Sequence, residues 1–281
     1  MEKLTLPAPA KLNLFLHINA QHANGYHELQ TIFQFIDYCD ELSFTPRSDR
    51  EIHLHAKIAG VSTHNNLISR AARLMQQHDK KRRGIDIHLK KIIPLGAGLG
   101  GGSSNAATTI LALNHLWDLR LTLSQLIKLG LQLGADIPVF LQGQACWAEN
   151  LGEQITPLQL PTPWFVVVVP PVNISTAEIF CDSKLTRDTP KTDISLSLLE
   201  TGENDCQPIV MRRYPEVAQA LNWLNQFSTA QMTGTGGAVF ARFESEAQAN
   251  EIIEQLPSTF KGFVTQGLNT SPLLTALKIN R

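Results

Sequence analysis

The chain has 281 residues, of which 43% are apolar and 17% charged, and its formal net charge is −1. That length fits one large domain or two modest ones, and the composition excludes a disordered chain. The near-neutral charge excludes a general attraction to nucleic acid or to an acidic membrane, so an anionic ligand needs a local site. We therefore expect no nucleic-acid partner and no membrane partner.

The cysteines and the N-terminal segment show no sign of export. No two cysteines form a C-x-x-C pair, which argues against a zinc site or a disulfide framework. Residues 1–16 lack a basic segment followed by a long apolar run, and the apolar run 164–170 is far shorter than the roughly 20 residues of a membrane-spanning helix. We expect a cytoplasmic protein that is a monomer or a weak homodimer.

Alternating residues near the N-terminus predict the first strand. Apolar residues at 12, 14, 16 and 18 give it one buried face, and Lys11 and Asn13 lie on the opposite face. Asn24-Gly25 predicts a tight turn that places Tyr26 and His27 at a loop tip. Further strands are expected at 29–38, 41–45, 51–58, 85–89, 165–169 and 238–243.

Two histidines, His53 and His55, share one face of the expected strand 51–58. A strand with a polar, solvated face accounts for them without any ligand. We therefore interpret them as surface residues and expect no metal site there.

Capping residues and apolar spacing predict the helices. Asn66 can cap a helix at 67–77 and Ser124 one at 124–133, with a helix at 103–117 between them. Phe140 and residues 145–148 are expected in short strands, and the proline-rich segment 154–163 is expected to be a linker. Further helices are expected at 176–180, 194–200, 205–213, 215–225 and 246–255.

A glycine-rich loop reads P-L-G-A-G-L-G-G-G-S-S-N at 94–105, with five glycines from Gly96 to Gly102. A packed core gains nothing from so many glycines, because each one costs conformational entropy on folding. Glycine is favoured where main-chain N–H groups approach a ligand closely. The loop leads into a helix N-terminus, which attracts anions, and two serines add hydroxyl donors. These features predict a cradle for phosphates.

Other phosphate-binding loops fit this segment less well. A Walker A loop ends in G-K-[ST], whereas Gly102 is followed by Ser103. A dinucleotide fingerprint is formally present, but the expected helix is followed by a second helix and not by a buried strand ending in an acid. A protein-kinase loop joins two strands, whereas this loop enters a helix. A flexible surface hinge seldom carries two serines at a helix start.

Four segments together resemble the GHMP superfamily of galactokinase, homoserine kinase, mevalonate kinase and phosphomevalonate kinase. The central motif of that superfamily, P-x-G-A-G-L-G-G-S-S-A, matches residues 94–106. The other three segments are P-A-K-L-N-L-F-L at 9–16, G-A-D-I-P-V-F at 134–140 and M-T-G-T-G-G-A-V-F at 232–240.

The resemblance implies a two-domain α+β GHMP-kinase fold with the active site in the cleft between the domains. It implies an N-terminal, ATP-binding domain that is ribosomal protein S5 domain 2-like, at residues 1–155. It also implies a C-terminal domain at residues 156–281 that is a ferredoxin-like α/β sandwich.

Finer details resemble one branch of the superfamily. These details are N-G-Y-H-E-L-Q-T at 24–31, the extra glycine in G-L-G-G-G-S-S-N-A-A and the segment G-A-D-I-P-V-F-L. They imply ATP-dependent phosphorylation of the 2-hydroxyl of 4-diphosphocytidyl-2-C-methyl-D-erythritol. The products would be the 2-phosphate and ADP, in the non-mevalonate (methylerythritol phosphate) pathway to isoprenoid precursors.

Two charged residues are the candidates for catalysis. Asp136 lies in the G-A-D-I-P turn, where a carboxylate can accept the proton of the acceptor hydroxyl. Without the resemblance, a turn or capping aspartate explains it equally well. Lys11 would lower the pKa of that hydroxyl and offset the charge that develops on the phosphoryl group. Without the matching P-A-K-L-N motif, a solvated lysine is the ordinary interpretation.

The resemblance also assigns the nucleotide site. Lys91 is placed to meet phosphates, and Asn66 and Leu67 to line the adenine pocket. Phosphoryl transfer needs a divalent ion, for which Mg²⁺ is the natural candidate, and Ser104 is one possible ligand. The loop residues expected to hold ATP are Pro94, Leu95, Gly96, Ala97, Gly98, Leu99, Gly100, Gly101, Gly102, Ser103 and Ser104.

For the acceptor substrate, aromatic stacking is expected to set specificity. Tyr26 and Phe180 would sandwich the cytosine ring, and His27 would bind the base edge. Asn13 and Thr176 would reach the diphosphate or the sugar alcohol. Outside the resemblance, Tyr26 and Phe180 would be ordinary half-buried aromatics.

Two other functions remain open at this point. A sibling kinase acting on homoserine, mevalonate or a sugar would keep the glycine loop and lose the aromatic clamp. A non-catalytic nucleotide-binding module would lack Lys11 or Asp136, and both are present.

Overall fold

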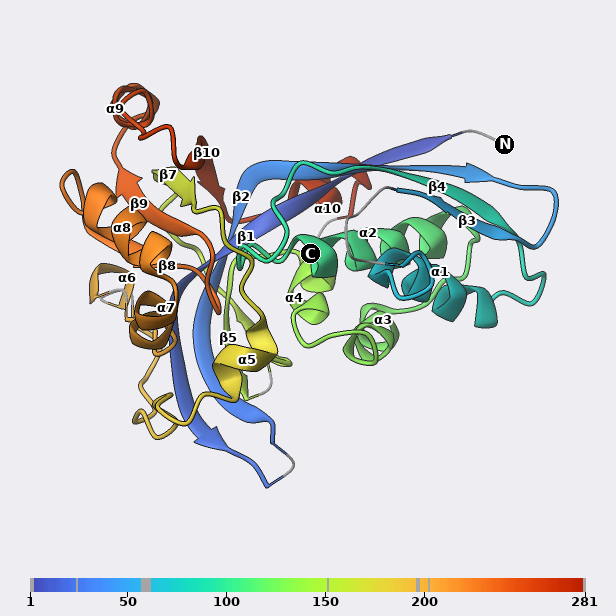
Figure 1. The fold of residues 1–281 in the computed structure, drawn as a ribbon. Coiled ribbons are helices and arrows are strands. Elements are labelled where there is room, and N and C mark those ends of the chain that lie inside the picture. Colours follow the sequence, from blue (N-terminus) through green and yellow to red (C-terminus); the bar gives the residue numbers. More distant parts are fainter. Residues whose placement is uncertain are drawn as a thin grey trace.

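The computed structural model describes residues 3–23, 25–56, 62–150, 152–195, 198–201 and 203–279. Within these ranges, ten strands form one sheet and the helices pack against it, so the architecture is α+β (Figure 1). The strands are β1 (Leu4–Gln21), β2 (His27–Pro46), β3 (Ile52–His55), β4 (Ile85–Lys90), β5 (Cys146–Asn150), β6 (Gln154–Pro157), β7 (Trp164–Val169), β8 (Ala230–Met232), β9 (Val239–Phe243) and β10 (Lys261–Leu268).

The sheet connects the two ends of the molecule. Its order is β3-β4-β2-β10-β7-β9-β8, with β1 and β5 also paired to β2, and β6 paired to β5. The helices are α1 (Leu67–Gln77), α2 (Gly101–Leu116), α3 (Leu123–Leu131), α4 (Ile137–Gln142), α5 (Thr176–Phe180), α6 (Leu198–Thr201), α7 (Gln207–Arg213), α8 (Pro215–Leu224), α9 (Glu246–Ile253) and α10 (Pro272–Ala276).

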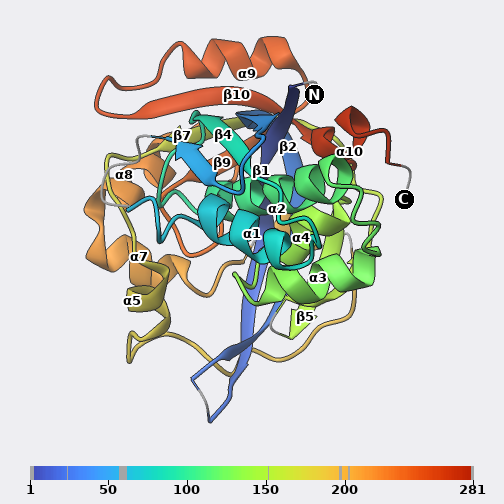
Figure 2. The same ribbon diagram turned by 90° about the vertical axis from the view of Figure 1, so that its right-hand side faces the viewer.

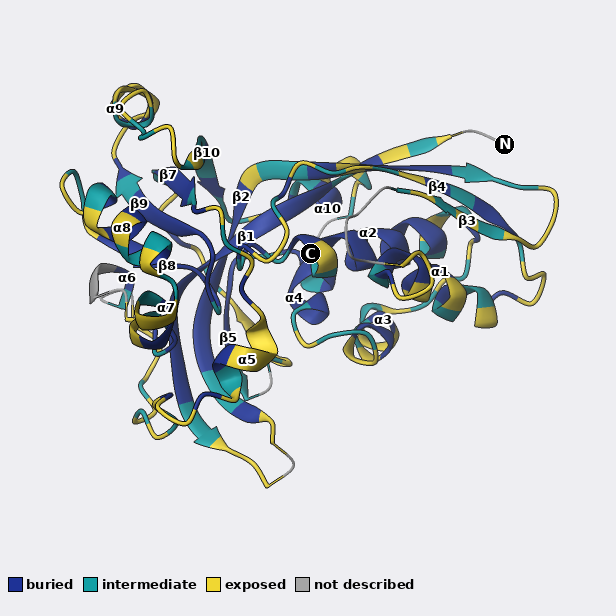
Figure 3. Cartoon of the chain, viewed as in Figure 1, coloured by how far each residue is buried: buried dark blue, intermediate teal, exposed yellow. Residues whose placement is uncertain are grey.

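The β1–β2 hairpin runs through the whole molecule (Figure 1). The expectation of one buried face on the first strand is wrong, because β1 is buried on both faces along most of its length (Figure 3). Leu14 and Phe15, which are neighbours in the strand, are 2% and 1% exposed. The expected strands at 29–38 and 41–45 are parts of the single strand β2. Register shifts follow Pro9, Asn13 and Ile18.

The turn at the end of this hairpin differs from the prediction in one respect. Asn24 lies outside the described residues, and Gly25 has a φ of +85°. Tyr26 is 60% exposed, as expected of a loop tip. His27 is not at the tip, since it is the first residue of β2 and is 9% exposed.

Helices α1 to α4 form a layer against one side of the β1–β2 hairpin (Figure 2). The predicted cap of α1 is confirmed, because the Asn66 side chain accepts a hydrogen bond of 2.9 Å from Ile68 N–H. The cap of α3 is Thr122 and not Ser124, since Thr122 forms a capping box with Gln125. Phe140, expected in a strand, lies in α4; a short buried apolar run does not distinguish helix from strand.

The remaining helices and strands form the other end of the molecule. Helix α5 has its predicted bounds, and α7, α8 and α9 lie within two residues of theirs. Strands β8 and β10 and helix α10 were not predicted. In both views α9 runs beside β10 (Figures 1 and 2). None of the helices in the described ranges has both the length and the apolarity that crossing a bilayer requires.

The segment 154–163 is not a free linker. Its first four residues form β6, in which Pro157 pairs with Cys146 of β5. Leu158 N–H donates to Ala145 O at 2.8 Å, and Leu160 N–H donates to the Asn269 side chain at 2.9 Å. The segment therefore stays hydrogen-bonded to the rest of the protein despite its prolines. The division of the chain at residue 155 stays a prediction.

Candidate active site

The glycine-rich loop lies between β4 and the N-terminus of α2. Gly96, Gly98 and Gly100 have φ angles of +66°, +75° and +72°, a left-handed conformation that glycine adopts without strain. Left-handed residues in a turn direct main-chain N–H groups toward one concave side, which favours an anion. Gly100 is also the N-cap of α2, so the positive end of the helix dipole faces the same loop.

A second glycine-rich segment, residues 233–237, packs directly on the first. A Cβ atom added to Gly98 would lie 2.3 Å from the carbonyl oxygen of Thr233 and 2.8 Å from that of Gly236. Ala238 N–H donates to Ala97 O at 2.9 Å. The two segments therefore touch backbone to backbone, which only glycine allows at this distance.

Lys11 extends from β1 into the glycine loop and is 3% exposed. Its Nζ donates to Gly98 O at 3.0 Å and to the Asn13 side chain, and it lies 4.0 Å from Asp136 Oδ2. Burial lowers the pKa of Lys11, and the negative charge of Asp136 partly opposes this shift. A bound phosphate would oppose it further, because a nearby anion favours the charged amine.

Asp136 occupies the N-cap position of α4, but its side chain makes no capping hydrogen bond. A capping aspartate normally uses a carboxylate oxygen to accept an N–H of the first turn. The carboxylate of Asp136 is instead 45% exposed and borders the same space as the Lys11 amine. This placement favours a chemical role over the capping role that the sequence left open.

Asn13 holds the Lys11 amine in position. Its Nδ2 donates to Thr31 Oγ1 at 2.9 Å, so its Oδ1 is the atom that faces the lysine. Its main-chain N–H donates to Thr233 Oγ1 at 2.8 Å, which ties β1 to the second glycine segment. Thr31 in turn donates to Phe15 O at 2.6 Å.

A single cavity of about 440 Å³ contains the glycine loop and both charged residues. Its size falls within the roughly 300–1,000 Å³ of typical small-molecule sites. It is lined by residues between 11 and 152 and by residues between 176 and 235. The lining residues that the sequence predicted are Lys11, Asn13, Leu67, Lys91, Pro94, Leu95, Gly96, Ala97, Gly98, Leu99, Gly100, Gly101, Gly102, Ser103, Asp136, Thr176 and Phe180.

Lys91 lines this cavity, and a buried carboxylate holds its amine in place. Its Nζ lies 2.6 Å from Oδ2 of Asp40, a carboxylate with no exposed surface. Asp40 Oδ1 also accepts the N–H groups of Ile92 and Ile93, at 2.6 and 2.8 Å. Burial lowers the pKa of Lys91, and Asp40 opposes the shift. Asp40 thus fixes both the lysine and the start of the glycine loop.

Three further predicted residues differ in their relation to the cavity. Leu67 lines it, whereas Asn66 is 7% exposed and its side-chain oxygen caps α1. Ser104 has no exposed surface, and in the described part of the chain its Oγ has no hydrogen-bond partner. Buried hydroxyls nearly always have a partner, so this oxygen suits a ligand such as a hard cation or a phosphate.

Arg187 connects the turn end of the β1–β2 hairpin to the segment after α5. Its Nε donates to His27 Nε2 at 3.1 Å. Its Nη2 donates to the carbonyl oxygens of Phe180 and Asp182, both at 2.7 Å, and its Nη1 to that of Leu185 at 3.1 Å. The Phe180 ring stacks on His27 with 4.8 Å between ring centroids.

This contact determines the protonation of His27. A guanidinium can only donate, so Nε2 of His27 must be the acceptor and the neutral ring carries its proton on Nδ1. Burial lowers the pKa of His27, and the positive charge of Arg187 lowers it further. The ring is therefore a neutral imidazole with an Nδ1–H donor near neutral pH.

Thr176 and Tyr26 complete the predicted set. Thr176, the first residue of α5, shares a hydrogen bond of 2.8 Å between hydroxyls with Thr235 of the second glycine segment. Tyr26 is the most exposed of the predicted aromatic residues at 60%.

Sequence reasoning missed several residues that support this site. They contact the predicted residues from distant positions in the chain, and no local pattern singles them out. Two of them belong to quoted motifs, since Thr31 ends the N-G-Y-H-E-L-Q-T segment and Thr233 lies in the M-T-G-T-G-G segment. The residues are Thr31, Asp40, Arg187 and Thr233.

Comparison with known families matches this geometry. The model of the GHMP kinases N-terminal domain matches residues 66–144, and the model of the GHMP kinases C-terminal domain matches residues 192–262. The chain belongs to the GHMP kinase family. It is therefore a kinase, and membership implies that ATP is its phosphoryl donor.

The most similar relatives that we compared belong to one branch of the family. The 4-diphosphocytidyl-2-C-methyl-D-erythritol kinase of Pseudomonas paraeruginosa is 54% identical over 271 residues, 96% of each chain. The enzyme of the same name from Nitrosococcus oceani is 51% identical over 275 residues, 98% of each chain. The branch predicted from the motifs is thus confirmed.

Solved structures agree with this result. A crystal structure of 4-(cytidine 5'-diphospho)-2C-methyl-D-erythritol kinase superposes with a TM-score of 0.82 at 31% identity, covering 94% of this chain and 99% of that one. The Methanococcus jannaschii mevalonate kinase shares the fold, with a TM-score of 0.70 at 17% identity over 95% of this chain and 99% of that one. The predicted α+β GHMP-kinase fold is confirmed.

Proposed function

We propose that this protein transfers the γ-phosphoryl group of ATP to the 2-hydroxyl of 4-diphosphocytidyl-2-C-methyl-D-erythritol. The products are the 2-phosphate and ADP, and the step belongs to the non-mevalonate pathway to isoprenoid precursors. One observation carries the proposal: Lys11 and Asp136 lie 4.0 Å apart beside the glycine loop, in one cavity. Identity of 54% to a kinase named for this substrate, over 96% of each chain, supports the choice of acceptor.

The chemistry follows from the groups that meet in the cavity. The acceptor oxygen attacks the γ-phosphorus while the bond to the β–γ bridging oxygen breaks and ADP leaves. Asp136 accepts the hydroxyl proton. The amine of Lys11 lies beside the glycine loop and offsets the negative charge that develops on the transferred group. The main-chain N–H groups of residues 96–104 hold the phosphates in line with the acceptor.

We propose that Mg²⁺ accompanies the nucleotide. The site fits a hard cation, since Ser104 Oγ is buried without a hydrogen-bond partner in the described chain. Ser104 would hold the ion together with phosphate oxygens. When bound, the ion neutralises charge on the β and γ oxygens.

We assign the nucleotide base to the side of the cavity that Leu67 lines, next to Asn66, which caps α1. Lys91, fixed by Asp40, meets the phosphates of the nucleotide or of the acceptor substrate. Asn13 and Thr176 are placed to bind the diphosphate or the sugar alcohol of the acceptor.

The cytosine would stack on Tyr26 and lie at the edge of the Phe180 ring, because one face of Phe180 is already covered by His27. The Nδ1–H of His27 suits an acceptor on the base edge, and N3 of cytosine is such an acceptor. N3 of uracil carries a hydrogen and would oppose this donor. Arg187 is therefore the positioning residue that sets the tautomer on which base choice depends.

We expect Arg187→Gln to raise KM for the cytidyl acceptor by about tenfold, the cost of one charge-assisted positioning contact, and to leave KM for ATP near its original value. Loss of Arg187 raises the pKa of His27 toward its ordinary 6.5. The His27 ring should then become protonated at a higher pH in this variant than in the unaltered chain. Steady-state kinetics across pH, with ¹⁵N NMR of the His27 ring, measure both effects.

Arg212→Gln is the matched control. Arg212, like Arg187, lies near Asp182: its Nη2 is 3.7 Å from Asp182 Oδ1, and its side chain is 47% exposed. Unlike Arg187, it makes no hydrogen bond to His27 in the described structure. Its removal should change neither the tautomer nor the acceptor KM. Equal kinetics in both variants would remove Arg187 from base recognition.

We further propose that the enzyme works in the cytoplasm as a monomer or weak homodimer, with its site in a cleft between domains at 1–155 and 156–281. In the described part of the chain, few large apolar residues are exposed, namely Tyr26, Ile92, Leu95, Leu131 and Ile194. So few exposed apolar side chains argue against the large apolar patch of an obligate interface.

The experiment that tests the proposal is ADP release from ATP against a panel of acceptor alcohols. We expect kcat/KM for the cytidyl-methylerythritol acceptor to exceed that for homoserine, mevalonate and galactose by at least about 10³-fold, because those compounds lack the base that the aromatic residues bind. A preference for one of the other three would support a sibling kinase. No ADP with any acceptor would support a non-catalytic nucleotide-binding module.

A further inference from the structure

The outer face of the β3–β4 pair carries a cluster of metal-ligating side chains. The two strands are parallel, with His53 opposite Asp86 and His55 opposite His88. Because side chains alternate along a strand, these four point to one face. Ile87 and its neighbours on the other face pack into the core beneath. No residue of this cluster lines the cavity described above.

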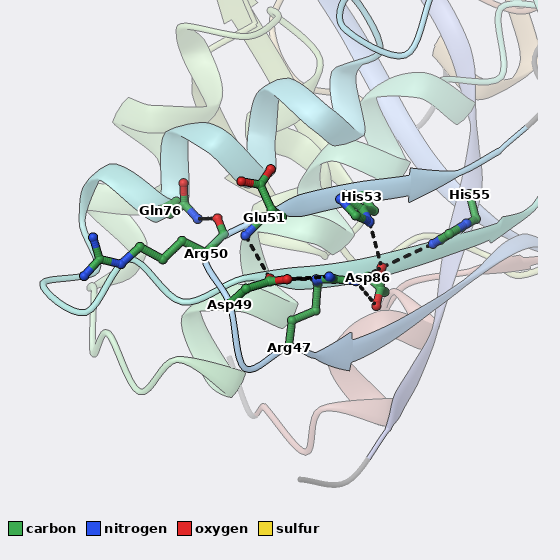
Figure 4. A network of polar contacts seen from close by, with 8 residues as sticks. All are labelled: Arg47, Asp49, Arg50, Glu51, His53, His55, Gln76 and Asp86. Atoms are coloured by element: carbon green, nitrogen blue, oxygen red, sulfur yellow. Dashed lines mark hydrogen bonds and ion pairs between the residues drawn. The ribbon is translucent and has the colours of Figure 1, made fainter.

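The distances within the cluster fit one metal ion. The nitrogens of His53 and His55 and an oxygen of Asp86 all lie within 4.8 Å of one another. His55 Nε2 is 3.2 Å and His53 Nδ1 is 3.6 Å from Asp86 Oδ1 (Figure 4). Ligands that surround a tetrahedral ion at bonds of about 2.0–2.1 Å are separated by about 3.3 Å. The cluster is therefore close to the spacing of a tetrahedral site.

Neighbouring residues hold two of these ligands in place. Arg47 Nη1 donates to Asp86 Oδ1 and Oδ2 at 3.0 and 2.9 Å, and Arg47 also pairs with Asp49 at 2.5 Å (Figure 4). The second carboxylate offsets the positive charge of Arg47, which would otherwise repel a cation. The His88 ring stacks on His55, with 4.2 Å between centroids and 8° between planes. Such outer contacts orient metal ligands and strengthen binding.

Exposure and ligand type identify the class of ion. The side chains of His53 and His55 are 47% and 48% exposed, so an ion and its water ligands have access. Imidazole nitrogens prefer Zn²⁺, Ni²⁺ and Cu²⁺, whereas Mg²⁺ prefers oxygen ligands. Two imidazoles and one carboxylate leave a position for water in a four-coordinate site.

We propose that His53, His55 and Asp86 bind one divalent transition-metal ion, of the Zn²⁺, Ni²⁺ and Cu²⁺ class, on the surface of the β3–β4 pair. The ion bridges two strands that are far apart in sequence and completes its coordination with water. The site is separate from the Mg²⁺ that accompanies ATP and does not depend on the proposed kinase chemistry. The histidines that the sequence alone assigned to a solvated face acquire their third ligand from β4.

The test is isothermal titration of the full, untagged chain with Zn²⁺, after chelator treatment and in the presence of excess Mg²⁺. We expect one Zn²⁺ per chain. We expect His55→Gln and His53→Gln each to weaken binding by at least about tenfold, as loss of one ligand does. His78→Gln is the matched control, because His78 is exposed at the end of α1, outside the cluster; it should bind as the unaltered chain does.

Two further measurements make the result unambiguous. Melting curves without metal verify that the variants fold, and Cu²⁺ electron paramagnetic resonance detects coordinated nitrogen. Hyperfine coupling to two nitrogens, lost in the double variant His53→Gln/His55→Gln, supports the site. The proposal is overturned if the unaltered chain binds no Zn²⁺, or if His55→Gln binds it as tightly as the unaltered chain and His78→Gln do.

Discussion

Replacement Asp136→Asn should lower kcat by at least about 10²-fold, the usual loss when a general base is removed. Asparagine keeps the shape of the side chain but cannot accept the acceptor proton. Nucleotide affinity should change by less than about threefold, because the loop that grips the phosphates is untouched. Single-turnover phosphoryl transfer and nucleotide titration measure the two quantities separately.

The matched control for this prediction is Asp118→Asn. Asp118 is also an aspartate beside a helix end, but its side chain is 70% exposed and pairs with the exposed Arg120. Exposed ion pairs contribute little, so turnover should stay within about twofold of the unaltered value. If Asp136→Asn behaved like Asp118→Asn, Asp136 would have no part in the mechanism.

The second large effect should come from Gly98→Ala. Alanine at this position would be held at a φ of +75°, and its Cβ would meet the Thr233 carbonyl oxygen at 2.3 Å. The two glycine segments would have to separate. We expect a loss of at least about 2 kcal/mol of folding free energy, since left-handed strain costs about 1–3 kcal/mol. We also expect a loss of at least about tenfold in ATP affinity, because the phosphate-binding amides shift.

Gly102→Ala is the matched control. It distinguishes the effect of the close backbone contact at Gly98 from the effect of replacing any glycine of the loop. Gly102 lies inside α2 without a positive φ, and a Cβ there meets only Leu67 at 3.6 Å. Alanine is favoured over glycine inside a helix by roughly 0.5–1 kcal/mol, so Tm should stay the same or rise. Thermal melting compares the two variants. A similar decrease of Tm in both would contradict the backbone contact as the cause.

Local signals in the sequence predicted much of the fold. Asn66 begins α1 as predicted, because a capping side chain acts on the N–H groups two or three residues ahead. Helix α5 also has its predicted bounds, and the structure shows Ser175 as its cap. Where two local signals compete, prediction fails: Thr122 and Ser124 could both begin α3, and the capping box with Gln125 decides.

Features that depend on contacts between distant segments were not predictable. The first strand has two buried faces because the leucines at 12 and 14 pack with apolar residues of β5, β7 and β9, whereas Lys11 and Asn13 contact the two glycine segments. The strand β6 looked like a linker because its pairing with β5 leaves no pattern in its own prolines. The short apolar run around Phe140 fits a strand or a helix equally well, and packing of α4 on α2 decides.

In the candidate site, too, residues that belong to local motifs were predicted and residues that act through distant contacts were not. Its glycine loop and its two charged residues belong to motifs, and the structure brings all three to one cavity. The supports of these residues do not belong to motifs: Asp40 holds Lys91 across 51 positions, and Arg187 holds His27 across 160. The role of a polar residue in such a pair can be recognised only when the structure shows which residue it contacts.

The most direct test is a crystal structure of the Asp136→Asn variant with Mg²⁺, ATP and the cytidyl acceptor, which the slow variant should trap before transfer. We expect the triphosphate to lie on the amides of residues 96–104, with the acceptor 2-hydroxyl within about 3.2 Å of the residue 136 side chain and the Lys11 amine beside the γ-phosphate. A triphosphate bound elsewhere, with residues 11 and 136 remote from the acceptor hydroxyl, would contradict the mechanism.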